Sequence, residues 1–245
     1  MRLHYDFHIH SCLSPCGDND MTPNNIVNMA LLAGLEAIAL TDHNSCRNCP
    51  AVLEAARGTG LTVLPGMELC CSEEAHVVCL FSTLEAALAF QETVYPTLPP
   101  VQNRPEIFGE QLVLDREDNI TGREDILLTT ASAISVDRVV ELARAHGGTA
   151  VPAHIDRPSY SVPAALGDIP SVGFPAAEIT AMADQKEMLR QYPEIRNKVL
   201  LRSSDAHYLH QIQEPGPWLE LPDKSPETIL AALDGRLPCA WSREI

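Results

Sequence analysis

The chain has no apolar run approaching the ~20 residues that cross a bilayer, so we expect no membrane-spanning segment. The N-terminus also lacks the basic-then-apolar stretch of a secretory leader, and we expect a cytoplasmic protein. Basic residues are few: 17 Lys and Arg stand against 33 Asp and Glu, giving a formal charge of −16 and a pI near 4.8. This balance argues against a surface that grips long nucleic acid and favours a small substrate.

Eight cysteines are present, and in the expected reducing compartment free thiols or metal ligands are favoured over a disulfide framework. Cys46 and Cys49 form a Cys-x-x-Cys pair, but no second pair completes a zinc ribbon. The pair is therefore open to a redox, metal-binding or purely structural interpretation.

The length of 245 residues is normal for a single α/β barrel. Short, nearly all-apolar strands alternate with helical stretches, for example at residues 35–40, 61–68 and 198–203, which indicates a parallel sheet covered by helices. Prolines interrupt this pattern at about 95–130, which we interpret as an insertion that is either a lid or a surface excursion. No linker separates two cores, so we expect residues 1–245 to form one domain.

The first strand ends in Asp6-Phe7-His8-Ile9-His10-Ser11. Residues two apart on a strand share a face, so His8 and His10 present neighbouring imidazoles, one edge of a metal site. Other strand ends offer further ligands of the same kinds, namely Asp42, His43, Glu68, His76, His154, Asp205 and His207. Because the C-terminal ends of barrel strands meet at one mouth, we expect one shared site.

This set of ligands is too large for one ion, since zinc takes about four donors and catalytic sites leave one position open. It predicts two to three divalent ions that share ligands. Imidazole and carboxylate donors suit Zn, Fe or Mn and disfavour Ca or Mg.

The ordered motifs resemble those of the PHP (polymerase and histidinol phosphatase) family: His8-Ile9-His10, Thr41-Asp42-His43, Gly66-Met67-Glu68, His76, His154 and Ser204-Asp205-Ala206-His207. The likeness runs from residue 6 to about 208. It implies an α/β fold, a distorted TIM-like (β/α)7 barrel, with a trinuclear metal centre that hydrolyses phosphoesters. Amidohydrolases also open with His-x-His, but the Thr-Asp-His motif and the spacing from Glu68 to His76 fit them poorly.

The resemblance also implies how the ligands divide. The first ion is held by His8, His10, Glu68 and Asp205, the second by Glu68, His76 and His154, and the third by His43 and His207. Asp42 is implied to orient a ligand. Where family members often place a further His or Asp, this chain has Ser14-Pro15-Cys16-Gly17-Asp18, so either Cys16 or Asp18 completes the third site, or that site is weak.

We expect a hydrolase in which a hydroxide bridging two ions attacks the phosphorus of a small phosphorylated substrate, a phosphomonoester or a nucleotide. Beyond the ligands, the candidates for catalytic roles are Asp42, Arg157 and His210. Arg157 is a candidate phosphate clamp because of its forked donors, with an ion pair to Asp156 or another acid as the alternative, and His210 is a candidate proton donor. A nuclease acting on nucleic-acid ends and a catalytically weak metal-binding regulatory module remain alternative functions.

Overall fold

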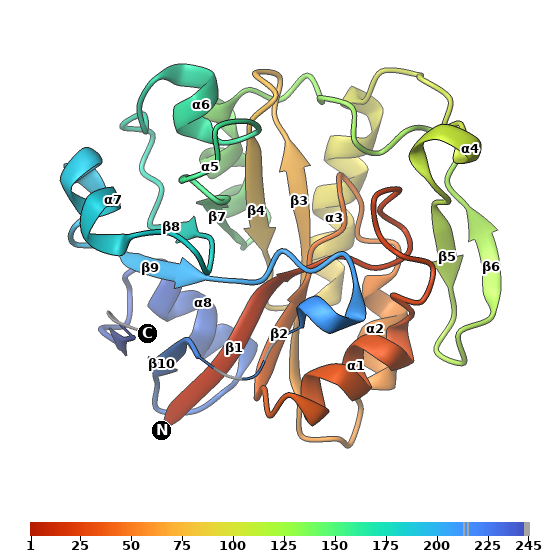
Figure 1. Cartoon of the computed structure of the whole chain (residues 1–245), viewed down its shortest axis with the longest axis horizontal. Helices are drawn as coiled ribbons and strands as arrows, with labels where there is room; N and C mark the ends of the chain where they lie inside the picture. Colours follow the sequence, from red (N-terminus) through yellow and green to blue (C-terminus); the bar gives the residue numbers. More distant parts are fainter. Residues whose placement is uncertain (213, 215, 243–245) are drawn as a thin grey trace.

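The computed structural model describes residues 1–212, 214 and 216–242, and in them an α/β protein is built on a strongly curled sheet (Figure 1). The sheet has the order β11-β10-β1-β2-β3-β4-β7. Its strands are β1 (Arg2–Ile9), β2 (Ala37–Leu40), β3 (Thr62–Cys70), β4 (His76–Leu80), β7 (Thr149–Pro152), β10 (Trp218–Glu220) and β11 (Ala240–Trp241). A parallel pair, β8 (Ala176–Ile179) and β9 (Val199–Arg202), forms a separate small sheet.

Backbone contacts join this pair to both sides of the curl. The N–H of Ile155, just after β7, donates to the carbonyl oxygen of Glu178 in β8 (2.9 Å). On the other side, Ile9 in β1 forms a parallel bridge with Ala206, just after β9. The strands β1, β2, β3, β4, β7, β8 and β9 therefore surround a common interior, and the predicted distorted barrel is confirmed.

Apolar side chains fill this interior toward the end of the barrel at which β3 and β7 begin. Alternate residues of the strands, such as Leu64, Val78 and Val151, belong to one buried cluster together with Ile229 of α8 (Pro226–Leu233). The ends of α8 are held by hydrogen bonds near the first residues of β3 and β7, from Thr62 to the carbonyl of Lys224 and from Thr149 to Asp234. Because α8 closes the end where these strands begin, the polar site is left to the opposite end.

Helices cover the outside of the barrel (Figure 1). They are α1 (Pro23–Leu32), α2 (Cys49–Ala55), α3 (Leu84–Val94), α5 (Val136–Ala145), α6 (Val162–Leu166) and α7 (Gln185–Gln191), with short 3₁₀ turns η1 (Tyr95–Thr97), η2 (Pro193–Ile195) and η3 (Leu209–Gln211). Thr22 caps α1, since its hydroxyl accepts the N–H of Asn25 and Pro23 occupies the first turn. None of the helices in the described part of the chain is long and apolar enough to span a bilayer.

The expected parallel sheet holds for β1, β2 and β3 but not for the strand that follows them. Strand β4 runs antiparallel to both β3 and β7. The link between β3 and β4, residues 71–75, is too short for the crossover that parallel neighbours require. His76 therefore stands at the start of β4, and the reversed direction of the strand brings it to the same mouth as Glu68.

Residues 95–130 form an excursion that contains α4 (Pro105–Phe108) and the hairpin β5 (Leu112–Leu114) and β6 (Ile120–Arg123), at the right of Figure 1. This excursion packs on the loop after β1: Leu13 joins Val113 and Leu128 in a small buried cluster. Gly109, with φ of +99°, lies so close to the carbonyl of Pro15 that a Cβ atom would collide with it. The excursion therefore supports the loop that follows the first His pair.

Candidate metal centre

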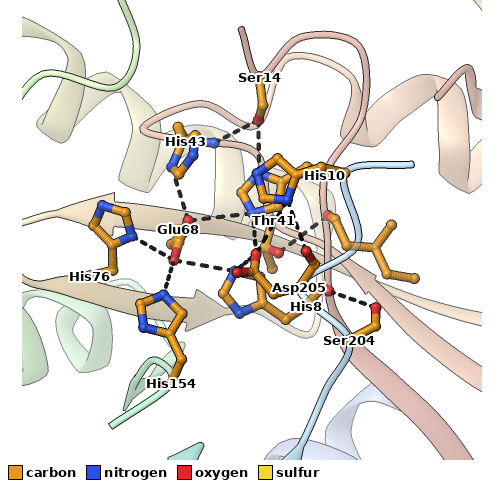
Figure 2. Close-up of polar contacts among 12 residues, drawn as sticks. His8, His10, Ser14, Thr41, His43, Glu68, His76, His154, Ser204 and Asp205 are labelled. Carbon is orange, nitrogen blue, oxygen red and sulfur yellow. Dashed lines mark hydrogen bonds and ion pairs between the residues drawn. The ribbon is translucent and has the colours of Figure 1, made fainter. Parts of the chain in front are cut away.

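The barrel mouth gathers buried imidazoles and carboxylates (Figure 2). Potential ligand atoms lie within 4.8 Å of one another in three groups, which are His8, His10, Glu68 and Asp205; His43, Glu68 and His76; and His10, His43 and His207. The groups share Glu68, His10 and His43. Because neighbouring groups share members, the arrangement suits more than one ion.

Glu68 lies at the centre of these groups (Figure 2). Its Oε1 is 2.9 Å from Nδ1 of His76, 3.1 Å from Nε2 of His154 and 3.3 Å from Nε2 of His8. Its Oε2 is 2.9 Å from Nδ1 of His43. Nε2 of His10 also lies 3.4 Å from Oε2, so one buried carboxylate faces five imidazoles, the geometry of a ligand that two cations can share.

The ligands reach the mouth in different ways. Glu68 and His76 do so by regular alternation, because side chains two apart on a strand point to the same face. His154 and Asp205 follow their strands in left-handed backbone, with φ of +31° and +52°. Such backbone is costly for residues other than glycine and is found mainly at functional sites.

Strand β1 requires a bulge to bring its His pair to the mouth. Phe7 faces the interior apolar cluster, whereas Ile9 joins the cluster under the outer helices. The pairing of β1 with β2 shifts register between Asp6 and Ile9. An irregularity of this kind changes which side chains face inward, and it places His8 and His10 on the interior side directly after Phe7.

Glu178 of β8 orients His8, and the sequence analysis missed it. Glu178 is 2% exposed, and its Oε1 lies 2.8 Å from Nδ1 of His8 and accepts the N–H of His154 at 3.2 Å. When Nδ1 donates to this carboxylate, the lone pair of Nε2 points toward Glu68 and Asp205. A single acidic residue in the otherwise apolar strand β8 was the available signal.

Asp42 lies behind His10 rather than at the mouth. Its carboxylate accepts the N–H (2.7 Å) and the hydroxyl (2.6 Å) of Ser11 and the hydroxyl of Ser14 (2.8 Å). Since Ser14 has one hydroxyl proton and gives it to Asp42, its oxygen accepts from Nδ1 of His10 at 2.9 Å. In the neutral imidazole of His10, Nε2 is then the unprotonated nitrogen, and it faces the mouth.

The charges in the mouth depend on one another. Burial raises the pKa of Glu68, but the imidazoles of His76, His8 and His43 outweigh burial and hold it well below its usual value. Burial lowers the pKa of His76, but Glu68 outweighs it and raises that pKa to about 10. Burial lowers the pKa of His43 to about 4 and that of His207 to about 3. Ionised carboxylates thus stand among charged and neutral imidazoles, a set whose protons bound cations displace.

Several buried atoms of this cluster make no hydrogen bond in the described chain: Nε2 of His8, Nε2 of His10, Nδ1 of His43, Oε2 of Glu68 and Oδ1 of Asp205. They face one another as ion-pair neighbours, for example Oε2 of Glu68 and Nδ1 of His43 at 2.9 Å. A buried polar atom that makes no hydrogen bond nevertheless costs about 1–3 kcal/mol. Convergent imidazole and carboxylate atoms are typical metal ligands, and bound ions would satisfy them. The residues therefore fit a multi-metal site.

The grouping can be compared with the division that the resemblance implies. The group of His8, His10, Glu68 and Asp205 has the members of the implied first site. In the second group His43 accompanies Glu68 and His76, while His154 lies outside the group but contacts Glu68. In the third group His10 joins His43 and His207.

Other predicted residues lie outside the three groups. Cys16 is exposed, and the carboxylate of Asp18 accepts the N–H of Asp20 at 2.8 Å. His210 is exposed on η3, and its ring lies 5.6 Å from that of Tyr208. Arg157 does reach the mouth: its Nη1 is 2.6 Å from Oδ2 of Asp205, and the side chain is 42% exposed.

Cys46 and Cys49 are buried beside β3. Their Sγ atoms lie 3.2 and 3.6 Å from the carbonyl oxygen of Gly66. The pair also stands outside the ligand groups.

Fold and site together define an α/β barrel protein whose mouth carries a candidate multi-metal centre. The PHP domain family matches residues 6–143, more than half of the chain. The protein therefore belongs to the PHP domain family, as the motifs predicted. No curated protein matches the chain.

Solved structures resemble the whole fold. The lesion-specific endonuclease Q of Pyrococcus furiosus has a TM-score of 0.68 at 20% identity over 98% of this chain. A complex of endonuclease Q with a 27-mer duplex carrying an abasic lesion has a TM-score of 0.67 at 20% identity over 98% of this chain. The chain spans 58% of the length of each. A candidate metal-dependent phosphoesterase from Bifidobacterium adolescentis has a TM-score of 0.60 at 17% identity, covering 93% of this chain and 95% of that one.

Proposed function

We propose that the protein hydrolyses a phosphoester bond of a small phosphorylated molecule, a phosphomonoester or nucleotide, at a centre of two or three Zn, Fe or Mn ions. The observation that carries this proposal is the buried Glu68 carboxylate, which two of the ligand groups share and which faces five imidazoles. Bound divalent ions would supply activation of water and polarisation of the phosphoryl oxygens.

The side chains of the mouth take distinct roles in this proposal. Asp42 and Glu178 act as positioning residues, the first through Ser14 on His10 and the second on His8. Arg157 binds a phosphate oxygen, because its ion pair with Asp205 holds the guanidinium at the mouth while part of it faces solvent.

The third ion has the least complete set of protein ligands. The loop after β1 lies beside its ligands, since the N–H of Asp18 donates to the carbonyl of His207 at 2.8 Å. Cys16 or Asp18 therefore stays the candidate for completing the group of His10, His43 and His207. A proton-donor role for His210 finds no support in contacts with the ligands.

A nuclease is the second candidate function. The fold of endonuclease Q, one structure of which holds duplex DNA, covers 98% of this chain. The charge of −16 opposes a long nucleic acid, so this candidate is confined to short single strands or ends.

The test combines metal analysis with a substrate panel. We expect two to three transition-metal ions per chain and hydrolysis within a panel of phosphomonoesters, nucleotides and short oligonucleotides. His10→Ala and Asp205→Ala should abolish hydrolysis, while Glu92→Ala, an exposed substitution on α3, should not. A preparation that is active without metal, or activity that survives both substitutions, would refute the proposal. Bound metal with no hydrolysis of any substrate would instead favour the regulatory module.

A further inference from the structure

Tyr160 is an aromatic residue at the edge of the metal centre that the proposed function does not use. Its side chain is 53% exposed, and its ring lies 5.1 Å from the ring of His76 at an interplanar angle of 30°. Its carbonyl oxygen accepts the N–H of His76 at 2.9 Å. Backbone and ring of Tyr160 are therefore both placed against a ligand of the centre.

The backbone conformation of Tyr160 costs stability, and the packing of its side chain does not explain why this cost is tolerated. Its backbone is left-handed, with φ of +55°, a region that bulky residues rarely adopt. A ring that stays half exposed also buries little apolar area, so it returns little stability for this strain. Strained residues at the edge of a site are typical of functional positions.

The distance of the ring from the ligands indicates what it binds. The rings of Tyr160, His76 and His43 follow one another at centroid distances of 5.1 and 5.2 Å, so Tyr160 stands one ring further from Glu68 than His76 does. A group stacked on Tyr160 is thus separated from a phosphate held near Glu68. In a nucleotide, the ribose separates base and phosphate in this way, whereas in an aryl phosphate the ring is bonded directly to the phosphate.

Arg157 lies on the same loop, three residues before Tyr160. Its contact with Asp205 places a cation at the mouth, while Tyr160 supplies a flat apolar surface. One short loop therefore offers both a partner for phosphate and a partner for a base.

We propose that Tyr160 is the stacking platform for the base of a nucleotide, so that the substrate is a mononucleotide or a terminal nucleotide. This inference rests on the proposed phosphoesterase function. Stacking of a base on an aromatic side chain changes affinity by roughly 10- to 100-fold, and this sets the size of the expected preference.

The test compares substrates that differ by the base alone. We expect kcat/KM for adenosine 5′-phosphate or 3′-phosphate to exceed that for ribose 5-phosphate by about 10- to 100-fold. Tyr160→Asn should bring this ratio to within about threefold of one, because Asn tolerates left-handed backbone and so removes the ring without added strain. Tyr160→Phe should keep the ratio, since the ring remains.

Tyr208→Ala is the matched control. Tyr208 is 44% exposed beside the same centre, but its ring contacts His210 and none of the ligand rings. We expect this variant to keep the ratio, and thermal unfolding of all variants checks their fold.

Several outcomes would overturn the proposal. They are a wild-type ratio near one, an unchanged ratio in Tyr160→Asn, a loss confined to Tyr208→Ala, or a preference for p-nitrophenyl phosphate over the nucleotides. Saturation-transfer NMR with adenosine tests the platform without turnover, and the signal should disappear in Tyr160→Asn. If the protein binds the base but hydrolyses no phosphoester, the proposed function is contradicted. The assignment of Tyr160 as the stacking platform would still be supported in that case.

Discussion

Replacing Glu178 by alanine should weaken metal binding, because it removes the carboxylate that orients His8. Oε1 of Glu178 lies 2.8 Å from Nδ1 of His8 and 3.2 Å from the backbone nitrogen of His154. Glu178 is 2% exposed and His8 is fully buried, so bulk water does not replace the lost partner. Removal of such a supporting hydrogen bond typically costs about 10- to 100-fold in metal affinity, or about 1.4–2.7 kcal/mol.

Glu178→Gln distinguishes the effect of the negative charge of Glu178 from the effect of its hydrogen bond with His8. Its amide oxygen still accepts from Nδ1 of His8, so we expect a smaller loss of affinity than in Glu178→Ala. Affinity is measured by competition for Zn²⁺ with a chromogenic chelator, and the visible spectrum of the Co²⁺ form reports the ligand geometry. Glu92→Ala is the control for loss of one negative charge at an exposed position. Wild-type affinity together with an unchanged Co²⁺ spectrum in Glu178→Ala would refute the role of Glu178.

Three further predictions concern metal removal and the loop after β1. Chelation should lower the melting temperature and added Zn²⁺ restore it, since ions at 100 times their Kd stabilise a folded state by about 2.7 kcal/mol; calorimetry showing no shift would contradict a metal centre. Ser14→Ala breaks the link from Asp42 to His10 and should weaken metal affinity about 10-fold in the competition assay; unchanged affinity would contradict this link. Gly109→Ala drives a Cβ into the carbonyl of Pro15 and should cost about 1–3 kcal/mol in urea unfolding; equal stability would show that the loop adapts.

Local patterns in the sequence were enough to predict most of the elements. The strands predicted at residues 35–40, 61–68 and 198–203 correspond to β2, β3 and β9. The ligand types were also readable, because His and acidic residues stand out at the ends of apolar strands. The direction of β4 was not predicted, although a link as short as residues 71–75 excludes the crossover that parallel neighbours need.

Tertiary structure alone decided how these residues converge. The inward turn of His8 depends on a bulge in β1, and that of His154 on left-handed backbone, neither of which appears in a period-two pattern. Glu178 and Tyr160 gained their significance only when the curled sheet brought their loops and strands to His8 and His76. Alternation along the chain determines which face a side chain occupies, but the distance between side chains from different strands is set by the closure of the barrel.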